Sequence, residues 1–248
     1  MSTVRKLFFA LSALLLAAPS LAAEPQQALL ITTPDWTDIR GAAQRYERGP
    51  DGHWHRVGAA FQIVVGKTGL AWGRGLTDTS KLEGPQKREG DLKAPAGVFP
   101  LVSAFGYGAT ADTELPYLQL SDSIECVDDP KSSHYNTLVD STKLAKDWSS
   151  SEHMHRDDEV YRYGVFVAHN TPASAGKGSC IFLHIWRGSD QGTVGCTAMA
   201  EGDILTLLAW LDPRKSPVLM QLPASQYEQF HQAWDLPYTP QDQTWDLP

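Results

Sequence analysis

Short runs of β-branched, aromatic and aliphatic residues, separated by Gly, Pro and Asp, recur along most of this 248-residue chain. Such runs are typical of strands that are joined by turns. Their irregular spacing predicts a mainly β fold, with a mainly antiparallel sheet of the β-sandwich kind. The expected strands are 28–32, 59–65, 98–105, 117–120, 137–139, 163–169, 180–186 and 218–222.

One helix stands out, at about 199–211. Glu201 and Asp203 lie in its first turn, where the helix dipole favours acidic side chains, and Pro213 follows its end. Packing of its apolar side on the sheet would fix the loop that precedes the helix. Four residues at helical spacing form that apolar stripe: Ile204, Leu207, Leu208 and Leu211.

The strand 180–186 is followed by a polar loop with glycines, which places His184 twelve residues before Cys196. Because side chains alternate along a strand, His184 shares a face with Phe182 and Trp186. A loop that folds back would bring Cys196 beside the imidazole. A cysteine next to a histidine is the minimum equipment for nucleophilic catalysis by a thiolate.

The alternative is a purely structural role for Cys196 as a small buried apolar residue, which is the commoner case for a cysteine. Cys180 fits that description because it lies in an apolar run. Cys196 instead follows Gly195, which allows a close backbone approach, and lies between a loop and the expected helix. This context favours Cys196 as the nucleophile, with His184 as its partner.

Two segments carry a family resemblance. Phe182-Leu-His184 and Thr193-Val-Gly195-Cys196-Thr-Ala-Met199 resemble the signature of the L,D-transpeptidase (YkuD-like) catalytic domain, a histidine after a strand and then Ser/Thr-x-Gly-Cys. Upstream, the segment 87–99 with Pro95, Gly97 and Phe99 looks like the Thr-Pro-x-Gly-x-Phe strand entry of the same family. The match covers much of residues 60–210.

Three positions depart from the family pattern. Ile185 follows the histidine in place of the frequent Ser or Gly, Val194 replaces the usual histidine before Gly-Cys, and Ala198 replaces an Arg or Asn. The spacing between the histidine and the cysteine is also short. These differences indicate a divergent branch of the family.

The resemblance implies an exported acyltransferase of the bacterial cell wall that needs no cofactor. Its acyl donor would be the tetrapeptide stem of peptidoglycan, held as a cysteine thioester and passed to an amine on a second stem or a wall-anchored protein. If water takes the acyl group instead, the same pair makes a peptidoglycan amidase or peptidase. A cell-wall binding module that lost its activity is the alternative from another class.

The residues themselves suggest how the site works. An imidazolium at His184 would lower the pKa of the thiol, so that a Cys–His ion pair supplies thiolate at neutral pH. Backbone N–H groups in Thr193–Cys196 are candidate donors to the oxyanion, with Gly195 permitting the curvature. A backbone carbonyl near Gly188, or less favourably the Asp190 side chain, would orient the imidazole.

Several residues are candidates for substrate binding. Arg187, Arg74 and Lys177 can bind a carboxylate, although ordinary solvated surface charge explains them equally well. Trp186 and Trp72 can line a groove, although packing in the core explains them equally well.

Two further clusters attract attention. Glu152-His-Met-His155-Arg-Asp-Asp158, with His169, has donors that zinc accepts. Because the usual long-range ligand pattern is missing, we expect no metal there and interpret the segment as a loop beside the substrate groove. His169-Asn170, at the end of a strand, is a second candidate for imidazole chemistry.

Residues 1–22 have the pattern of a secretory signal peptide. Arg5 and Lys6 precede a short apolar run, and Ser20 and Ala22 occupy the −3 and −1 positions of a cleavage site. An uncleaved anchor is the alternative, but the run is short for a membrane span. We therefore expect export to the periplasm or cell envelope, without stable membrane insertion after cleavage.

The net charge of the chain limits the classes of binding partner that we expect. Cleavage would reduce the 21 basic residues to 19 against 29 acidic ones, which leaves a net charge near −10. An acidic surface argues against nucleic acid and against anionic membranes.

The three cysteines leave an odd one in an exported protein. If Cys196 is free, Cys126 and Cys180 can pair, but the sequence does not give the separation that a disulfide needs, so the pairing stays open.

The expected domain organisation is a catalytic domain over 27–222 and a surface-bound or mobile C-terminal tail over 223–248.

Overall fold

The computed structural model describes residues 24–238, and within this part of the chain strands dominate. The strands are β1 (Gln27–Thr33), β2 (Arg40–Arg48), β3 (Trp54–Val64), β4 (Leu70–Trp72), β5 (Ala94–Gly106), β6 (Tyr117–Gln119), β7 (Ile124–Val127), β8 (Leu138–Asp140), β9 (Ser151–His153), β10 (Tyr163–Val167), β11 (Phe182–Ile185), β12 (Thr197–Met199) and β13 (Val218–Pro223). The helices are α1 (Glu201–Trp210) and α2 (Ala224–Phe230), with 3-10 turns η1 (Glu159–Tyr161) and η2 (Pro213–Lys215). The predicted mainly β class is confirmed.

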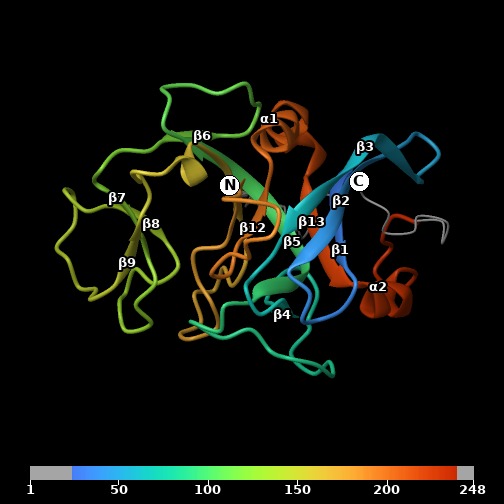
Figure 1. The fold of residues 1–248 in the computed structure, drawn as a ribbon, viewed down its shortest axis with the longest axis horizontal. Helices are drawn as coiled ribbons and strands as arrows, with labels where there is room; N and C mark the ends of the chain where they lie inside the picture. The colour runs from blue at the N-terminus through green and yellow to red at the C-terminus, as the bar shows by residue number, and fades with distance from the viewer. Residues whose placement is uncertain (1–23, 239–248) are drawn as a thin grey trace, which may run out of the picture.

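The large sheet closes on itself instead of forming two facing layers. Its path runs β10-β11-β12-β3-β2-β1-β13-β5, and β10 also pairs with β5. The long strand β5 makes this closure because its residues 97–100 pair with β13 while 101–106 pair with β10. The structure therefore corrects the expected sandwich to a barrel-like sheet (Figure 1). The closure of this sheet depends on pairing registers between distant strands, which no local sequence pattern reveals.

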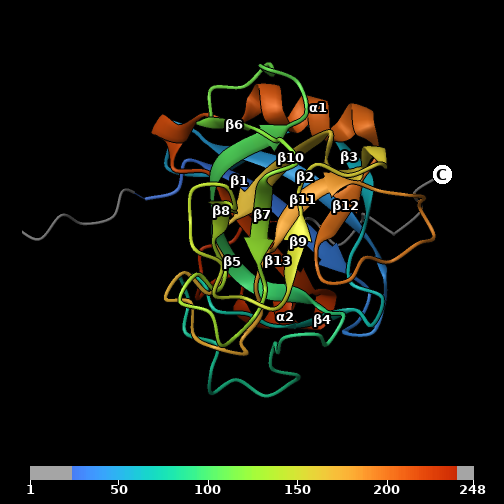
Figure 2. The same ribbon diagram turned by 90° about the vertical axis from the view of Figure 1, so that its left-hand side faces the viewer.

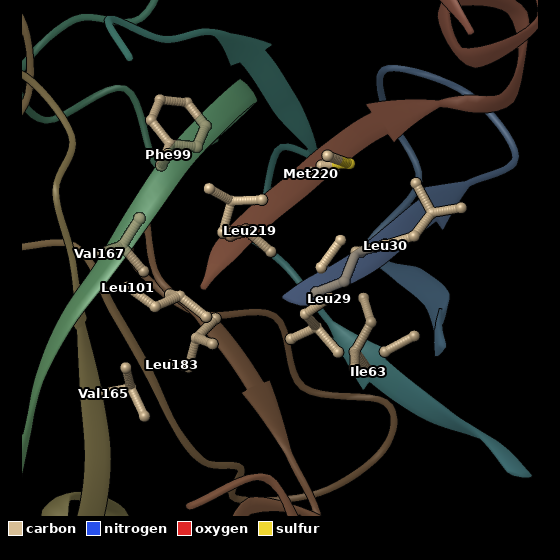
Figure 3. Packing of buried hydrophobic residues seen from close by; sticks show 14 of the residues in the cluster. Leu29, Leu30, Ile63, Phe99, Leu101, Val165, Val167, Leu183, Leu219 and Met220 are labelled. Atoms are coloured by element: carbon tan, nitrogen blue, oxygen red, sulfur yellow. The ribbon is translucent and has the colours of Figure 1, made fainter. Parts of the chain in front are cut away.

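Side chains from strands far apart in the sequence fill the interior. Leu29 of β1, Ile63 of β3 and Leu219 of β13 are all buried there, and Leu183 joins them from β11 (Figure 3). Since side chains alternate along a strand, Leu183 and its neighbour Ile185 point into this core and turn His184 away from it. The core thus fixes the direction of the histidine.

Helix α1 covers one end of the sheet, directly after β12 (Figure 1). The predicted apolar stripe is buried, and the helix begins at Glu201 and ends at Trp210, close to the predicted bounds. The segment before it pairs with β11, so the helix and the sheet together hold the loop that ends in Cys196.

Some elements escaped prediction. Strand β2 overlaps a charged segment of the sequence. Ala43 and Tyr46 are buried there, while Arg40 is exposed and Arg45, Glu47 and Arg48 are partly buried. The structure also extends the folded domain past residue 222, where the sequence predicts a tail. Tyr227 and Leu236 are buried in the core, and Trp234 packs against Trp72.

A second, three-stranded sheet, β8-β7-β9, lies beside the barrel-like sheet (Figures 1 and 2). A disulfide between Cys126 of β7 and Cys180, just before β11, joins the two sheets, which confirms that pairing. Cys196 is free. The small sheet is therefore tied covalently to the chain that leads into the histidine strand.

The predicted signal peptide, residues 1–22, lies outside the described residues, as do residues 239–248 of the predicted tail. Between residues 24 and 238 the structure has no helix with the length and apolar character that crossing a membrane demands.

The disulfide closes a long loop, because its cysteines are 54 positions apart in the sequence. The double variant Cys126→Ser/Cys180→Ser should unfold with a free energy about 2–4 kcal/mol lower than wild type, because the unfolded chain regains loop freedom. Urea denaturation measures this. Dithiothreitol should lower the stability of wild type and leave the double variant unchanged; equal stability of the oxidised and reduced wild type would contradict the prediction.

Candidate active site

The parallel pairing of β11 with β12 brings the predicted histidine and cysteine together. Leu183 pairs with Thr197 and His184 with Ala198, so Cys196, just before β12, lies level with Phe182. The Phe182 N–H donates to the Cys196 sulfur at 3.3 Å. His184 and Cys196 both line one cavity of about 350 Å³.

Cys196 is a buried, protonated thiol in this state. Its side chain is 3% exposed, and the thiol donates to the Cys180 carbonyl at 3.5 Å. Burial raises the pKa of the Cys196 thiol far above its ordinary value, and the charge of Glu152 adds to this. The hydrogen bond from the Phe182 amide and the charge of Lys87 act in the opposite direction without reversing the shift.

His184 is a buried, neutral imidazole. It is 7% exposed, and burial lowers its pKa to about 4. Its Nδ1 lies 2.8 Å from the Ile185 carbonyl, so in the neutral ring Nδ1 carries the proton and Nε2 is left as a base. A backbone carbonyl does orient the ring, as predicted, but it belongs to Ile185, while Gly188 and Asp190 make no such contact within residues 24–238.

The predicted thiolate–imidazolium ion pair is therefore corrected for this state. A pKa of about 4 for His184 leaves it uncharged at neutral pH, and the raised pKa of Cys196 leaves the thiol protonated. Two charges at this depth would each have lost most of their hydration, and the site avoids that cost by staying neutral.

The loop before Cys196 is shaped by Thr193. Its hydroxyl donates to the Cys196 carbonyl at 2.6 Å and accepts from the Gly195 N–H at 3.1 Å. Gly195 has a φ of +155°, a conformation that residues with a side chain rarely adopt. The Gly195 N–H is thus already used. In the loop 193–196, the N–H groups of Val194 and Cys196 have no protein acceptor within residues 24–238. These two can donate to an oxyanion.

Sequence analysis missed Tyr161, and it identified Glu152 only as part of a loop beside the groove. The Tyr161 hydroxyl donates to Glu152 Oε1, and the edge of its ring contacts His184 with centroids 5.2 Å apart. Glu152 comes from the small sheet, where it pairs with Cys126. Its place beside Cys196 depends on that long-range pairing, and Tyr161 belongs to no motif that could have identified it.

The predicted substrate-binding residues fall into two groups. Arg187 and Trp186 line the cavity, and Arg187 forms an ion pair with Asp158 at 2.6 Å. Arg74 is exposed and lies outside the cavity, and Trp72 is buried in the core.

The cavity has a basic character, which suits a ligand with carboxylates. Lys67, Arg156 and Arg187 line it, and Glu152 is the one acidic residue among the residues that line it.

His169 is built into the fold. Its Nδ1 accepts from the Arg74 N–H at 3.2 Å, and its Nε2 donates to the Lys177 carbonyl at 3.1 Å. Burial lowers its pKa to about 4. Because both ring nitrogens are used by the backbone, His169 has no nitrogen free for chemistry.

The 152–158 segment does not gather metal ligands. His155 contacts Asp122 at 2.5 Å, while Glu152 turns toward Tyr161. Within residues 24–238 no three His, Cys, Asp or Glu side chains lie close enough to hold a metal ion. Glu152 and Arg156 line the cavity, so the segment does flank it.

Comparisons with models of known families, with curated proteins and with solved structures find no match. The geometry of the cavity is thus what bears on its chemistry.

The neutral thiol predicts low reactivity. At pH 7, alkylation of folded protein by iodoacetamide should be about a hundredfold slower than in urea, because thiolate is the reactive form and folding suppresses it. Intact-mass analysis over time gives both rates, and the disulfide keeps Cys126 and Cys180 out of the measurement. Equal rates in both states would show an exposed or ionised Cys196.

The two neutral histidines predict acid sensitivity. As pH falls from 6.5 to 4, an unfolded chain binds protons at His169 and His184 while the folded chain does not, so stability falls. Each residue accounts for up to about 3 kcal/mol. Urea unfolding at stepped pH measures the loss. In His184→Gln the loss over this window should shrink by one histidine's share, and an unchanged loss would show that His184 is not buried neutral.

Proposed function

We propose that the chain is an exported cysteine L,D-transpeptidase that acts on peptidoglycan stem peptides, and that its barrel-like sheet is a divergent form of the L,D-transpeptidase catalytic fold. One observation carries the proposal: a thiol and an imidazole with a free Nε2 share a basic cavity beside two unused N–H groups. The resemblance around His184 and Cys196 supports the same assignment.

In the proposed reaction, His184 Nε2 takes the thiol proton as the sulfur attacks the carbonyl of the stem peptide. The N–H groups of Val194 and Cys196 stabilise the oxyanion. His184 then gives the proton to the leaving amine, and the acyl group remains on sulfur. Because its pKa is near 4, the imidazolium is a strong acid and gives up the proton readily.

An inactive cell-wall binding module is the second candidate, and the burial of Cys196 favours it. A module of this kind needs the basic cavity and not the thiol, so its Cys196 would remain unreactive even with substrate bound.

Intact-mass analysis with a carbapenem, and then with a purified tetrapeptide muropeptide, tests the proposal. Wild type should form a covalent adduct, Cys196→Ala should form none, and His184→Ala should acylate about 10²–10³-fold more slowly. Cross-linked product indicates transfer to an amine, while trimmed peptide alone indicates a hydrolase. Absence of adduct and product in wild type would leave the binding module.

Two arginines provide a matched pair for substrate binding. Arg187→Ala should raise KM for the muropeptide, because Arg187 lines the cavity, whereas Arg74→Ala should have no effect.

A further inference from the structure

A second cavity, of about 200 Å³, reaches Cys196 from the side of the disulfide. Glu152, Val194 and Cys196 line both cavities, while Cys180 and Ser179 line only the smaller one. Cys196 therefore borders a cavity on each of two sides. A group that enters the smaller cavity meets an acyl chain on Cys196 from the side away from His184.

The smaller cavity has the opposite charge to the larger one. Its acidic residues are Glu89, Asp128 and Glu152, and its one lysine, Lys87, is neutralised by Asp91 at 2.5 Å. The net charge that the smaller cavity presents to a ligand is therefore negative. Such a cavity favours a cation of small size, and an ammonium group fits that description.

Glu152 is the acidic residue next to the sulfur. Tyr161 donates to its Oε1, while Oε2 makes no hydrogen bond within residues 24–238. Desolvation raises the pKa of the Glu152 carboxyl, and the hydrogen bond from Tyr161 and the charge of Arg156 offset this only in part. A carboxyl group that has lost hydration, has one oxygen unused and faces a cavity is typical of a functional position.

The position of Glu152 is held from two sides. On β9 it pairs with Cys126, whose disulfide to Cys180 fixes the strand against the chain that leads into β11. From the other side, Tyr161 reaches it from η1. The carboxyl group is thus preorganised beside the sulfur.

We propose that the smaller cavity is the site of the acceptor amine, and that Glu152 binds the ammonium form of this amine and takes one of its protons. This inference rests on the proposed function, because it concerns the second half of the acyl transfer. A primary amine attacks a thioester only when it is uncharged, so a base beside the sulfur is required.

The proposed step transfers the acyl group from the Cys196 sulfur to the amine nitrogen. Glu152 carboxylate takes one proton from R–NH₃⁺ and becomes a carboxylic acid, and the neutral amine nitrogen forms a C–N bond with the thioester carbonyl. The C–S bond breaks and its electron pair stays on the Cys196 sulfur. A second amine proton passes from the nitrogen to that sulfur as the amide forms, and the carboxylic acid later loses its proton to solvent.

Glu152→Gln tests the proposal because it keeps the shape of the side chain and removes the base. With a tetrapeptide muropeptide as donor, the acyl-enzyme should still form, since removal of a negative charge does not disfavour the thiolate. Transfer to glycinamide, which is largely cationic at neutral pH, should fall about a hundredfold with a raised KM. Transfer to hydroxylamine, which is uncharged at neutral pH, should stay within about threefold of wild type.

Glu159→Gln is the matched control. Glu159 lies on η1 near Tyr161, is exposed and forms an ion pair with Arg162, and it lines neither cavity. Both amines should react with its acyl-enzyme as with wild type. A reduced glycinamide rate here would assign the effect to general charge.

The outcomes separate the two proposals. If wild type forms no acyl-enzyme, the proposed function and this inference both fail. If wild type transfers and Glu152→Gln transfers to glycinamide equally well, only the inference fails. If Glu152→Gln loses acylation, or loses transfer to both amines alike, Glu152 acts on the sulfur or on the fold, which also overturns the inference.

Discussion

The pairing of β11 with β12 is the constraint on which the site depends. It sets Phe182 beside Cys196 and His184 two residues further along the same face. The barrel interior fixes this face, because Leu183 and Ile185 are buried in it and a shift of one residue would exchange core and cavity side chains. The geometry of the candidate site and the packing of the core thus depend on opposite faces of one four-residue strand.

The sequence was sufficient for what alternation and helical period encode. The direction of His184, the stripe of α1 and the mainly β class all follow from patterns within a few residues. The sequence likewise predicts the candidate pair Cys196 and His184, and both line the same cavity.

The features that could not be predicted from the sequence depend on pairing between strands that are far apart in the chain. The closure of the sheet through β5 and β10 is set by register, and the place of Glu152 is set by its pairing with Cys126. Arg74 and Arg187 look alike in the sequence, yet only Arg187 reaches the cavity. The predicted ion pair failed for a similar reason, because burial is a property of the whole fold and changes both pKa values at once.

The neutral state of the pair bears on how such a site would work. An ion pair at rest would have to be desolvated during folding, and the cost would lower stability whether or not substrate is present. In the proposed reaction a neutral pair develops charge only as the sulfur attacks, when the Phe182 N–H already donates to that sulfur and the N–H groups of Val194 and Cys196 are unused by the protein. Interactions that act only at that stage lower the barrier without tightening the binding of the ground state. The disulfide contributes to the same end, because it holds the small sheet, and with it Glu152, against the sulfur before any ligand arrives.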